Sequence, residues 1–543
     1  MPVLDLGHST IIGHCPTKQS IINDATAIAA CIHDINHPLA VVVGKRGPSV
    51  AVDPVLTLGS DKGLPVHAWL PAGPVSGLGD RAFCTTHGLR YSYMAGAMAN
   101  GIASVELCVA LAGAGMLGSF GAGGLSLERT RAAIHTIRAA IGQAPFAVNL
   151  IHAPHEPAHE EAVVDLLLEE RVRLIEASAY LGLTAAVVRY RLTGIRELPD
   201  GSVHCPNRII AKASRVEVAT RWLSPPPAKL VAELLKRGVI DETQAALASR
   251  VPMAEDLTAE ADSGGHTDNR AAIALYPTFL SLAERLTAEH GYPAPLRIGA
   301  AGGISTPASA AAAFGMGLAY LCTGSVNQAC LESGSCDHVR AVLAEVEQAD
   351  VCMAPAADMF EMGVKLQVIR RGTMFPMRAA KLWRCYEDHA RWEDIPQTQR
   401  EEIEKNIFRR SFAEVWADTE AFWQRREPDQ AERGRQDPKR RLALCFRWYL
   451  GMASHWANRG DPERRLDYQI WAGPAMGAFN EWTKGSFLAD PAQRTATCVA
   501  RNLLVGAARQ QRLTMLRAQG IRLDSALGRI VPVEESQLLE LVP

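Results

Sequence analysis

Two glycine-rich turns are the part of this chain best suited to do chemistry. Leu296-Arg-Ile-Gly-Ala-Ala-Gly-Gly-Ile304 precedes a helix-forming run that starts at Thr306, and Tyr320-Leu-Cys-Thr-Gly-Ser325 precedes a second. Such turns place backbone N–H groups at two neighbouring helix N-termini, where they can hold a phosphate. In a (β/α)₈ barrel the turns after the last two strands are the usual phosphate site. The pair therefore predicts a barrel that binds a phosphorylated cofactor or substrate, with two ligand-free tight turns as the alternative.

Polar side chains mark the ends of other predicted strands. They are Asn100, Asn149, Glu176, Ser178, Lys212, Ser214, Glu260, Asp262, His266 and Asp268. A lysine and an asparagine at a barrel mouth could hydrogen-bond a flavin ring or a sugar phosphate. For Lys212 alone, a paired core residue is an equally open interpretation, because buried lysines are rare unless paired. His266 follows Gly264-Gly265, which lets the backbone approach a ligand closely, although a surface-loop histidine is the alternative.

Two motifs suggest other sites, and neither fits its surroundings. Gly113-Ala-Gly-Met-Leu-Gly118 matches the dinucleotide-binding fingerprint, which requires a strand before it and a helix after it. Here residues 104–112 predict a helix and residues 116–120 predict a strand, so a tight turn between them is favoured. His152, His155 and His159 have a superficially metal-like spacing, but two prolines prevent one regular helix. We predict a mobile loop at the barrel mouth there and no metal.

Apolar runs alternate with helical runs from residue 86 to residue 355. The predicted strands are Ser92–Met98, Gly115–Phe120, Phe146–Ile151, Leu174–Ala177, Arg208–Ala213, Asp256–Glu260, Leu296–Ala300 and Ala319–Thr323. Eight strands in this alternation favour an α/β fold of the (β/α)₈ TIM-barrel type over an open doubly wound sheet. A charged helical excursion at 225–251 interrupts the barrel pattern between the fifth and sixth strands.

The flanking segments differ from the barrel pattern. Residues 1–85 are punctuated by Pro and Gly and predict a small N-terminal lobe rich in β-structure. Residues 356–543 predict a helical C-terminal region with its own core, because eight of the ten Trp lie at position 383 or later. The charged run Arg425–Arg441 within it predicts a solvated linker or turn.

Composition excludes several function classes. Lys and Arg (56) nearly balance Asp and Glu (58) in the 543 residues. We therefore expect no long-range electrostatic attraction for nucleic acid or for an anionic membrane. The N-terminus lacks the pattern of a signal peptide, and no long apolar run predicts a membrane span. The twelve Cys form no C-x-x-C pair, which is typical of reduced thiols. We therefore expect a cytoplasmic protein.

Several motifs of the chain resemble those of a known family. Glu260-Ala-Asp-Ser-Gly-Gly-His-Thr-Asp268, Gly299–Pro307 and Thr323–Ala329 resemble the PfaD family. Its members are trans-acting enoyl reductases of polyunsaturated fatty acid synthases and of polyketide synthases that use free-standing acyltransferases. Arg447-Trp-Tyr-Leu-Gly and Asp467–Trp482 resemble the same family's C-terminal signature. The barrel is more distantly similar to FMN-type enoyl reductases and nitronate monooxygenases.

The resemblance implies an FMN-binding barrel and a role for each matching residue. The FMN phosphate would lie against Gly302, Gly303, Gly324 and Ser325. The isoalloxazine would be lined by Ala97, Met98 and Asn100, and its polar edge would meet Asn149 and Lys212. Gly264, Gly265 and His266 would lie beside the ring, with His266 near the substrate.

The resemblance also implies an activity. Hydride would pass from NADPH through FMN to Cβ of a 2-enoyl thioester on an acyl-carrier protein, and a proton would go to Cα. His266 is the first candidate for the protonation step, with Asp262 and Asp268 next. A flavin oxidase or nitronate monooxygenase on the same barrel, and an assembly module without chemistry, remain as alternatives. The choice between NADPH and NADH and the presence of a homodimer stay open.

The chain lacks the G-x-S-x-G motif of an acyltransferase, so we expect a stand-alone reductase that acts in trans. The C-terminal region and the excursion at 225–251 would form the lid and the surface that docks the carrier. Arg435–Arg441 and Arg459–Arg465 are candidate basic patches for an acidic carrier, and a solvated charged face is the alternative for each.

Overall fold

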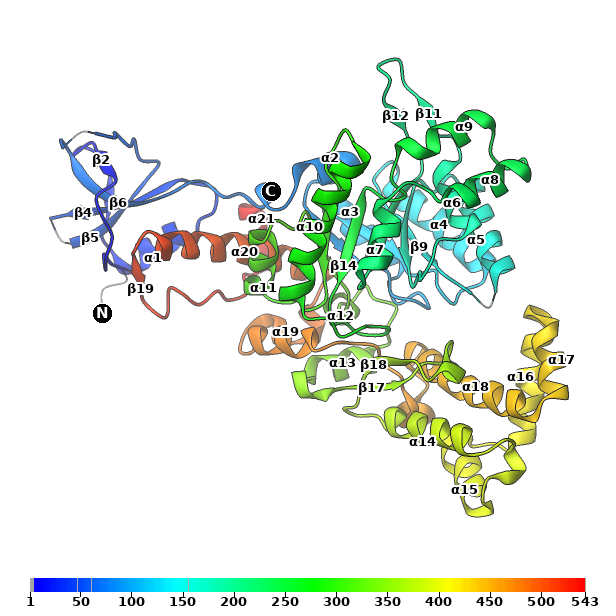
Figure 1. Cartoon of the computed structure of the whole chain (residues 1–543). Coiled ribbons are helices and arrows are strands. Elements are labelled where there is room, and N and C mark those ends of the chain that lie inside the picture. The colour runs from blue at the N-terminus through cyan, green and yellow to red at the C-terminus, as the bar shows by residue number, and fades with distance from the viewer. Residues whose placement is uncertain (1–3, 46, 60, 155, 543) are drawn as a thin grey trace.

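A closed barrel of eight parallel strands forms the centre of the molecule (Figure 1). The computed structural model describes residues 4–45, 47–59, 61–154 and 156–542. The barrel strands are β7 (Tyr93–Ala95), β8 (Leu117–Phe120), β9 (Ala147–Ile151), β10 (Leu174–Ser178), β13 (Arg208–Ala213), β14 (Asp256–Glu260), β15 (Arg297–Ala301) and β16 (Leu321–Thr323). Every predicted strand contributes, and β16 pairs with β7 to close the ring. The predicted (β/α)₈ barrel is confirmed.

Helices follow the barrel strands and cover the outside of the ring. They are α3 (Val105–Gly113), α4 (Leu127–Ile141), α5 (Pro157–Glu169), α6 (Ala185–Leu192), α7 (Val216–Leu223), α10 (Ala272–His290), α11 (Pro307–Gly315) and α12 (Ser325–Gln328). Hydroxyl side chains such as Ser104, Ser126 and Thr306 cap their helices by accepting a backbone N–H of the first turn. The fingerprint-like run at Gly113 joins α3 directly to β8, so it is the predicted turn between a helix and a strand.

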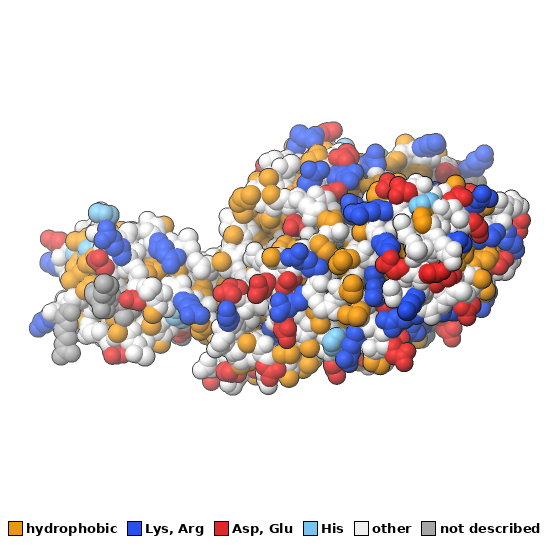
Figure 2. All heavy atoms as spheres, turned by 90° about the horizontal axis from the view of Figure 1, so that it is seen from below, with side chains coloured by type: hydrophobic (Ala, Val, Ile, Leu, Met, Phe, Trp, Pro, Cys, Tyr) orange, Lys and Arg blue, Asp and Glu red, His pale blue; other side chains and the backbone are white. Residues whose placement is uncertain are grey.

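The N-terminal lobe stands apart from the barrel (Figures 1 and 2). Its antiparallel sheet has the order β2 (Gly13–Cys15), β6 (Leu64–Leu70), β4 (Leu39–Gly44), β5 (Gly47–Val52) and β3 (Ile21–Ile22), with α1 (Ala25–His33) beside it. The long helix α20 (Ala496–Ala518) runs from α11 on the barrel to this lobe. Leu513, Leu516 and Ile521 join the core of the lobe, so distant C-terminal residues complete it.

The C-terminal region contains the strands β17 (Val351–Pro355) and β18 (Lys365–Ile369) and packs against one end of the barrel. Its main helices are α14 (Phe375–Asp388), α15 (Gln397–Glu402), α16 (Phe412–Arg426), α17 (Pro428–Gln436), α18 (Pro438–Arg459) and α19 (Ala475–Thr483). Within the described part of the chain, no helix is long and apolar enough to cross a membrane.

The prediction of a solvated linker at Arg425–Arg441 is wrong. This run forms the end of α16, all of α17 and the start of α18. Pro428 and Pro438 occupy the first turns of α17 and α18, where a proline fits because its missing N–H has no helical partner. Charge density alone is a poor sign of a linker, because arginines can pair along and between helices.

The excursion at 225–251 lies away from the C-terminal region. It forms α8 (Ala228–Lys236) and α9 (Glu242–Leu247). Arg250 contacts Glu197 at 2.7 Å on the hairpin of β11 (Arg196–Glu197) and β12 (Val203–His204), which precedes β13. Connections that enter a strand lie at the N-terminal end of the barrel, opposite the mouth. The expected lid role of this excursion is therefore wrong.

Three buried ionisable side chains lie at the N-terminal end of the barrel. Arg297 Nε lies 2.6 Å from Asp256 Oδ1, and His87 Nε2 lies 2.8 Å from Asp256 Oδ2. His87 ends helix α2 (Arg81–His87), so the cluster joins that helix to the first residues of β14 and β15. Burial by itself would raise the pKa of Asp256, but His87 and Arg297 more than offset it and lower this pKa to about 2.

We expect Asp256→Asn to lower thermal stability strongly, because it leaves His87 and Arg297 buried beside a neutral amide. Breaking a buried ion pair costs about 3–5 kcal/mol. Since the folded pKa of Asp256 is about 2 and an unfolded Asp has about 3.9, its contribution is complete above pH 4. The contribution is lost as the pH falls from about 4 towards 2. Thermal unfolding of both proteins across that range measures the difference.

Asp337→Asn is the control for this prediction. The Asp337 carboxylate is 97% exposed and pairs with Arg340 at the surface, so its loss should cost less than about 1 kcal/mol. Equal destabilisation by the two substitutions would contradict a structural role for the buried cluster.

Candidate active site

A lysine held between two carboxylates lies at the carboxyl ends of the barrel strands. Lys212 Nζ on β13 is 2.9 Å from Glu260 Oε1 on β14 and 3.7 Å from Glu176 Oε1 on β10. The Lys212 side chain is only 14% exposed, and that of Glu176 is fully buried. Burial opposes the charge of Lys212, but Glu260 and Glu176 outweigh it and raise its pKa. Lys212 is therefore a permanent cation at the mouth.

Glu176 connects this lysine to the turn after β7. Its Oε2 accepts the backbone N–H of Ala97 at 2.7 Å, while its buried Oε1 accepts no hydrogen bond from any described residue. Asn149 lies on the neighbouring strand and donates its amide to Glu176 O at 3.0 Å and to Ser178 Oγ at 2.9 Å. The structure thus brings Ala97, Asn149 and Lys212 together around Glu176.

The two glycine turns leave space beside their backbones. Gly302 and Gly303 have φ of +84° and +78°, a conformation that suits glycine. A Cβ built on Gly303 or Gly324 would meet no atom within 4 Å, whereas one on Gly302 would meet Ala261 C at 2.5 Å. The N–H groups of Gly303 and Gly324 donate to no acceptor among the described residues. Free N–H groups beside open space fit a bound phosphate.

A segment of the C-terminal region, residues 469–474, lies directly against this part of the barrel. We call it the mouth segment. The N–H of Gly473 donates to Ser325 Oγ at 3.1 Å, and a Cβ on Gly264 would meet Ala472 Cα at 2.6 Å. The segment is also fixed to β18, because Ile369 N–H donates to Ile470 O at 2.9 Å. One wall of the site therefore comes from outside the barrel.

His266 lies on the loop after β14 and faces a carboxylate of the C-terminal region. Its Nε2 is 3.1 Å from Asp358 Oδ1, and its side chain is 41% exposed. Partial burial would lower the pKa of His266, but Asp358 outweighs this effect and raises it above its usual value. Gly265 exchanges two backbone hydrogen bonds with Gln367 of β18, which anchors the base of the loop.

The two aspartates named as further proton donors are engaged elsewhere. Asp268 accepts from Arg215 Nε at 2.8 Å and from Ser214 Oγ at 2.5 Å. Hydrogen bonding from Arg215 is the largest influence, and the pKa of Asp268 is lowered to about 2. Asp262 Oδ1 accepts from the amides of Asn269 and Gln367. Asp268 is therefore ionised near neutral pH and cannot donate a proton.

The turn after β7 contacts the C-terminal region as well as the barrel. Asn100 has a φ of +59°, and its side-chain amide donates to Ser454 Oγ of α18 at 3.2 Å. Met98 in the same turn is half-buried against the barrel core. The structure therefore places every predicted site residue at the mouth, and it draws Asn100 towards α18.

The histidine run after β9 is only partly described by the structure. Among the described residues, no group of three His, Cys, Asp or Glu side chains is arranged to hold a metal ion. The His152 ring stacks on Tyr180 with centroids 4.9 Å apart, and His159 belongs to α5. His155 lies outside the described residues.

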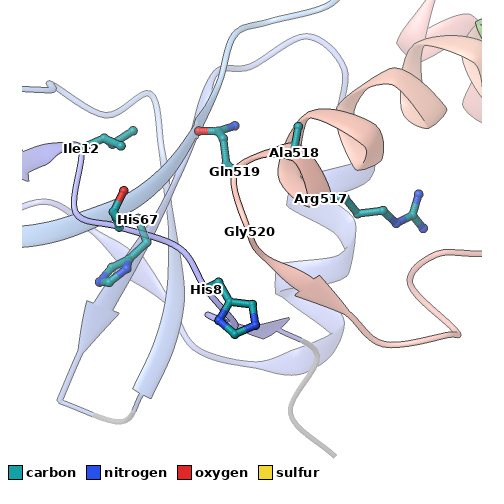
Figure 3. Close-up of a pocket in the computed structure, with 8 residues that line it drawn as sticks. His8, Ile12, His67, Arg517, Ala518, Gln519 and Gly520 are labelled. Atoms are coloured by element: carbon teal, nitrogen blue, oxygen red, sulfur yellow. The ribbon is translucent and has the colours of Figure 1, made fainter.

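A separate hollow lies far from the mouth, between the N-terminal lobe and the end of α20 (Figure 3). It has a volume of about 440 Å³ and is lined by His8, Thr10, Ile12, His67, Arg517, Ala518, Gln519 and Gly520. None of the predicted site residues lines it, so it belongs to no part of the candidate site.

Sequence reasoning missed the residues that the C-terminal region contributes. Asp358 lies 92 residues after His266, so no local spacing connects the two. Ala472 and Gly473 fall within a run that the family resemblance had marked, but nothing in that run indicates that it faces Gly264. The carboxylates Glu176 and Glu260 were named as strand-end residues without their pairing to Lys212.

Comparisons with known proteins cover both the barrel and the helices. Residues 84–391 match the family model described as nitronate monooxygenase. Residues 389–468 match the one described as the inserted helical domain of [acyl-carrier-protein] S-malonyltransferase.

Two curated relatives and one solved structure are similar over most of the chain. A polyunsaturated fatty acid synthase subunit of Thraustochytrium sp. is 49% identical over 447 residues, which is 81% of this chain and 30% of that protein. Polyketide biosynthesis protein PksE of Bacillus subtilis is 38% identical over 498 residues, which is 91% of this chain and 63% of that protein. The chain thus spans less than two thirds of either relative. The enoyl reductase domain of MlnA from Bacillus amyloliquefaciens is 35% identical with a TM-score of 0.78, covering 82% of this chain and 100% of that domain.

We expect Gly264→Ala to loosen the mouth segment, because the new Cβ would meet the backbone of Ala472 at 2.6 Å. Overpacking of this kind typically costs about 1–3 kcal/mol. Hydrogen exchange at the amide of Gly473, which donates to Ser325, should become faster. Gly113→Ala is the control, since its Cβ would meet nothing within 4 Å. Unchanged exchange at Gly473 in the Gly264 variant would mean that the close approach does not hold the segment.

Proposed function

The chain belongs to the nitronate monooxygenase family, in its PfaD-like branch, and we propose from this premise that it is an FMN-dependent enoyl reductase. Its substrates would be 2-enoyl thioesters on the acyl-carrier proteins of a polyketide or fatty acid synthase, with NADPH as the hydride source. The observation that carries this proposal is the match to the MlnA enoyl reductase domain over all of that domain. Because that match covers 82% of this chain, it is longer than the barrel alone.

The residues at the mouth fit FMN. The open space and free N–H groups at Gly303 and Gly324 would receive its single phosphate. Lys212 is a buried cation suited to the electron-rich polar edge of the ring, with Asn149 beside it. When bound beside Lys212 and Asn149, the flavin would supply the two-electron, hydride-transfer chemistry that enoyl reduction requires.

The chain's own residues would orient the thioester and provide the proton. His266 carries its imidazole on a loop anchored by Gly265 and Gln367, and Asp358 favours the protonated form. An imidazolium is a suitable general acid near neutral pH, so His266 would donate a proton to Cα. The mouth segment lies across Gly264 and would exclude water from one side of the reacting centre.

Nitronate oxidation is the second candidate, because the matching family model for residues 84–391 is that of nitronate monooxygenase. The C-terminal region supports enoyl reduction instead, since it extends the match to an enoyl reductase domain beyond the barrel. Incubating the purified protein with NADPH and a crotonyl thioester tests enoyl reduction. Incubating it with a nitronate and oxygen tests nitronate oxidation. A carrier added as a separate polypeptide tests action in trans. A protein that binds FMN and does neither reaction would be an assembly module.

We expect the purified protein to show a flavin spectrum and Gly303→Val to lose it. A valine side chain would fill the open space at Gly303, where we place the phosphate. Gly317→Val is the matched control, since Gly317 also has a positive φ and open space but lies in the turn before β16. Both variants place a valine at a positive φ, and only Gly303→Val should weaken FMN binding in a fluorescence titration. Equal losses would assign the effect to strain.

We expect His266→Ala to keep FMN binding and flavin reduction by NADPH but to slow enoyl turnover about 10²–10⁴-fold, the usual contribution of a general acid. Stopped-flow absorbance separates the two half-reactions. Turnover at the wild-type rate would make His266 a loop residue without a catalytic role.

The pH profile provides a second test of His266. Because Asp358 raises the pKa of His266, the protonated donor persists to higher pH, and turnover should fall as the pH rises through that value. Asp358→Asn removes the carboxylate and should move this alkaline limb to lower pH. An unmoved limb would show that another group governs it.

A further inference from the structure

An exposed apolar patch lies on the C-terminal region, where the turn before α14 meets the 3₁₀ turn η7 (Pro462–Asp467). Met377 is 70% exposed, Leu466 48% and Met374 39%. The N–H of Met374 donates to Leu466 O at 2.8 Å, so the two segments are joined. Exposed apolar side chains gathered at one place indicate an interaction site, and methionine adapts to varied partner surfaces.

Positive charge borders this patch. Arg370 and Arg465 are exposed and make no ion pair with any described residue, whereas Arg371 is only loosely paired, 3.4 Å from Asp350 and 3.6 Å from Glu345. Glu463 is the exposed carboxylate beside Arg465. The face in Figure 2 mixes both signs of charge, and the chain as a whole carries a net charge of −2. Attraction for an acidic partner must therefore come from a local group of positive charges, such as the exposed arginines at this patch.

Several of the other candidate arginines are already engaged within the chain. Arg435 lies 3.3 Å from Glu432 and 3.4 Å from Glu420, and Arg440 pairs with Glu361. Arg464 is buried and lies 3.2 Å from Asp467. Of the two basic runs that the sequence suggested, the second offers an exposed arginine next to exposed apolar side chains.

The chain leads directly from this patch to the mouth. Asp467, the residue after Leu466, is fully buried and accepts the hydroxyl of Tyr449 at 2.7 Å, which fixes the end of the patch. Leu466 and Ala472 are six residues apart, so at most about 21 Å separates them. Ala472 packs on Gly264. This distance is of the order of an extended phosphopantetheine arm.

We propose that Met374, Met377 and Leu466, with Arg370 and Arg465, form the docking surface for an acidic helix of an acyl-carrier protein. The arm of the carrier then spans the distance of at most about 21 Å from Leu466 to Ala472 at the barrel mouth. Apolar side chains between cations are complementary to an amphipathic helix whose polar face is acidic. The assignment rests on the proposed function, and it identifies which face of the enzyme the partner approaches.

The test compares two substrates that differ only in the carrier. The kcat/KM is measured for a crotonyl group on a holo carrier protein and for the same group on a short thiol. Met377→Glu and Arg465→Glu should each lower the value for the carrier substrate on the order of tenfold, because each opposes an acidic helix. Neither substitution should change the value for the short thiol.

Leu58→Glu and Lys236→Glu are the matched controls. Leu58 is 72% exposed on the N-terminal lobe, and Lys236 ends α8 beside the other end of the barrel. Both make the same changes in polarity and charge away from the patch, so neither should affect either substrate. Added salt should reduce the preference of the wild type for the carrier and leave the Arg465 variant less sensitive.

Several results would overturn the proposal. Equal losses with both thioesters would place the patch in folding or catalysis, and no loss with either would exclude it from docking. A change in molecular mass by light scattering in Met377→Glu would make the patch a contact between two copies of this chain. If the wild type reduces neither thioester, the proposed function fails. Calorimetric binding of the holo carrier, weakened by the same two substitutions, then decides the docking surface independently.

Discussion

Lys212 and its two carboxylates are the interaction on which the candidate site depends. A buried ammonium is costly unless its charge is balanced by well-placed partners. Glu260 and Glu176 provide that balance from two other strands, at 2.9 and 3.7 Å. The parallel pairing of β13 with β10 and with β14 brings these strands side by side and therefore creates the environment that keeps Lys212 charged. Glu176 extends the cluster to the backbone of Ala97, so the charge and the turn after β7 are positioned together.

A second constraint is the contact between the barrel and the C-terminal region. Gly264 lacks a side chain, which lets the backbone of Ala472 approach it closely, and Gly473 binds Ser325 beside it. These contacts make residues far beyond the barrel part of its mouth. A barrel without this wall would leave the mouth open to water on that side.

The arginines of the C-terminal region are divided between two uses. Buried Asp467 lies 3.2 Å from Arg464 and also pairs with Arg378, so these cations stabilise the fold around Tyr449. Arg370 and Arg465 remain at the surface without ion pairs among the described residues. A nearly neutral chain can in this way present a basic surface at one place, because its other positive charges are cancelled locally.

The sequence by itself determined the barrel and most of its mouth. Short apolar runs and the glycine turns that end them act over a few neighbours, so β15, β16 and α11 could be located from local patterns. The polar residues at strand ends could be named because parallel strands place their carboxyl ends at one edge. Local charge density was the weaker guide, since α17 forms where a linker was expected.

Only the tertiary structure decided which of these residues act together. The pairing of Lys212 with Glu176, of His266 with Asp358 and of Gly264 with Ala472 joins segments that are far apart in the chain. The position of the excursion at 225–251 depended in the same way on the packing of β11, which lies at the end of the barrel opposite the mouth. Such contacts depend on how whole elements pack, and no spacing along one chain encodes the approach of two distant backbones. The types of residue in the candidate site could therefore be predicted from the sequence, whereas the partners of these residues could be identified only from the tertiary structure.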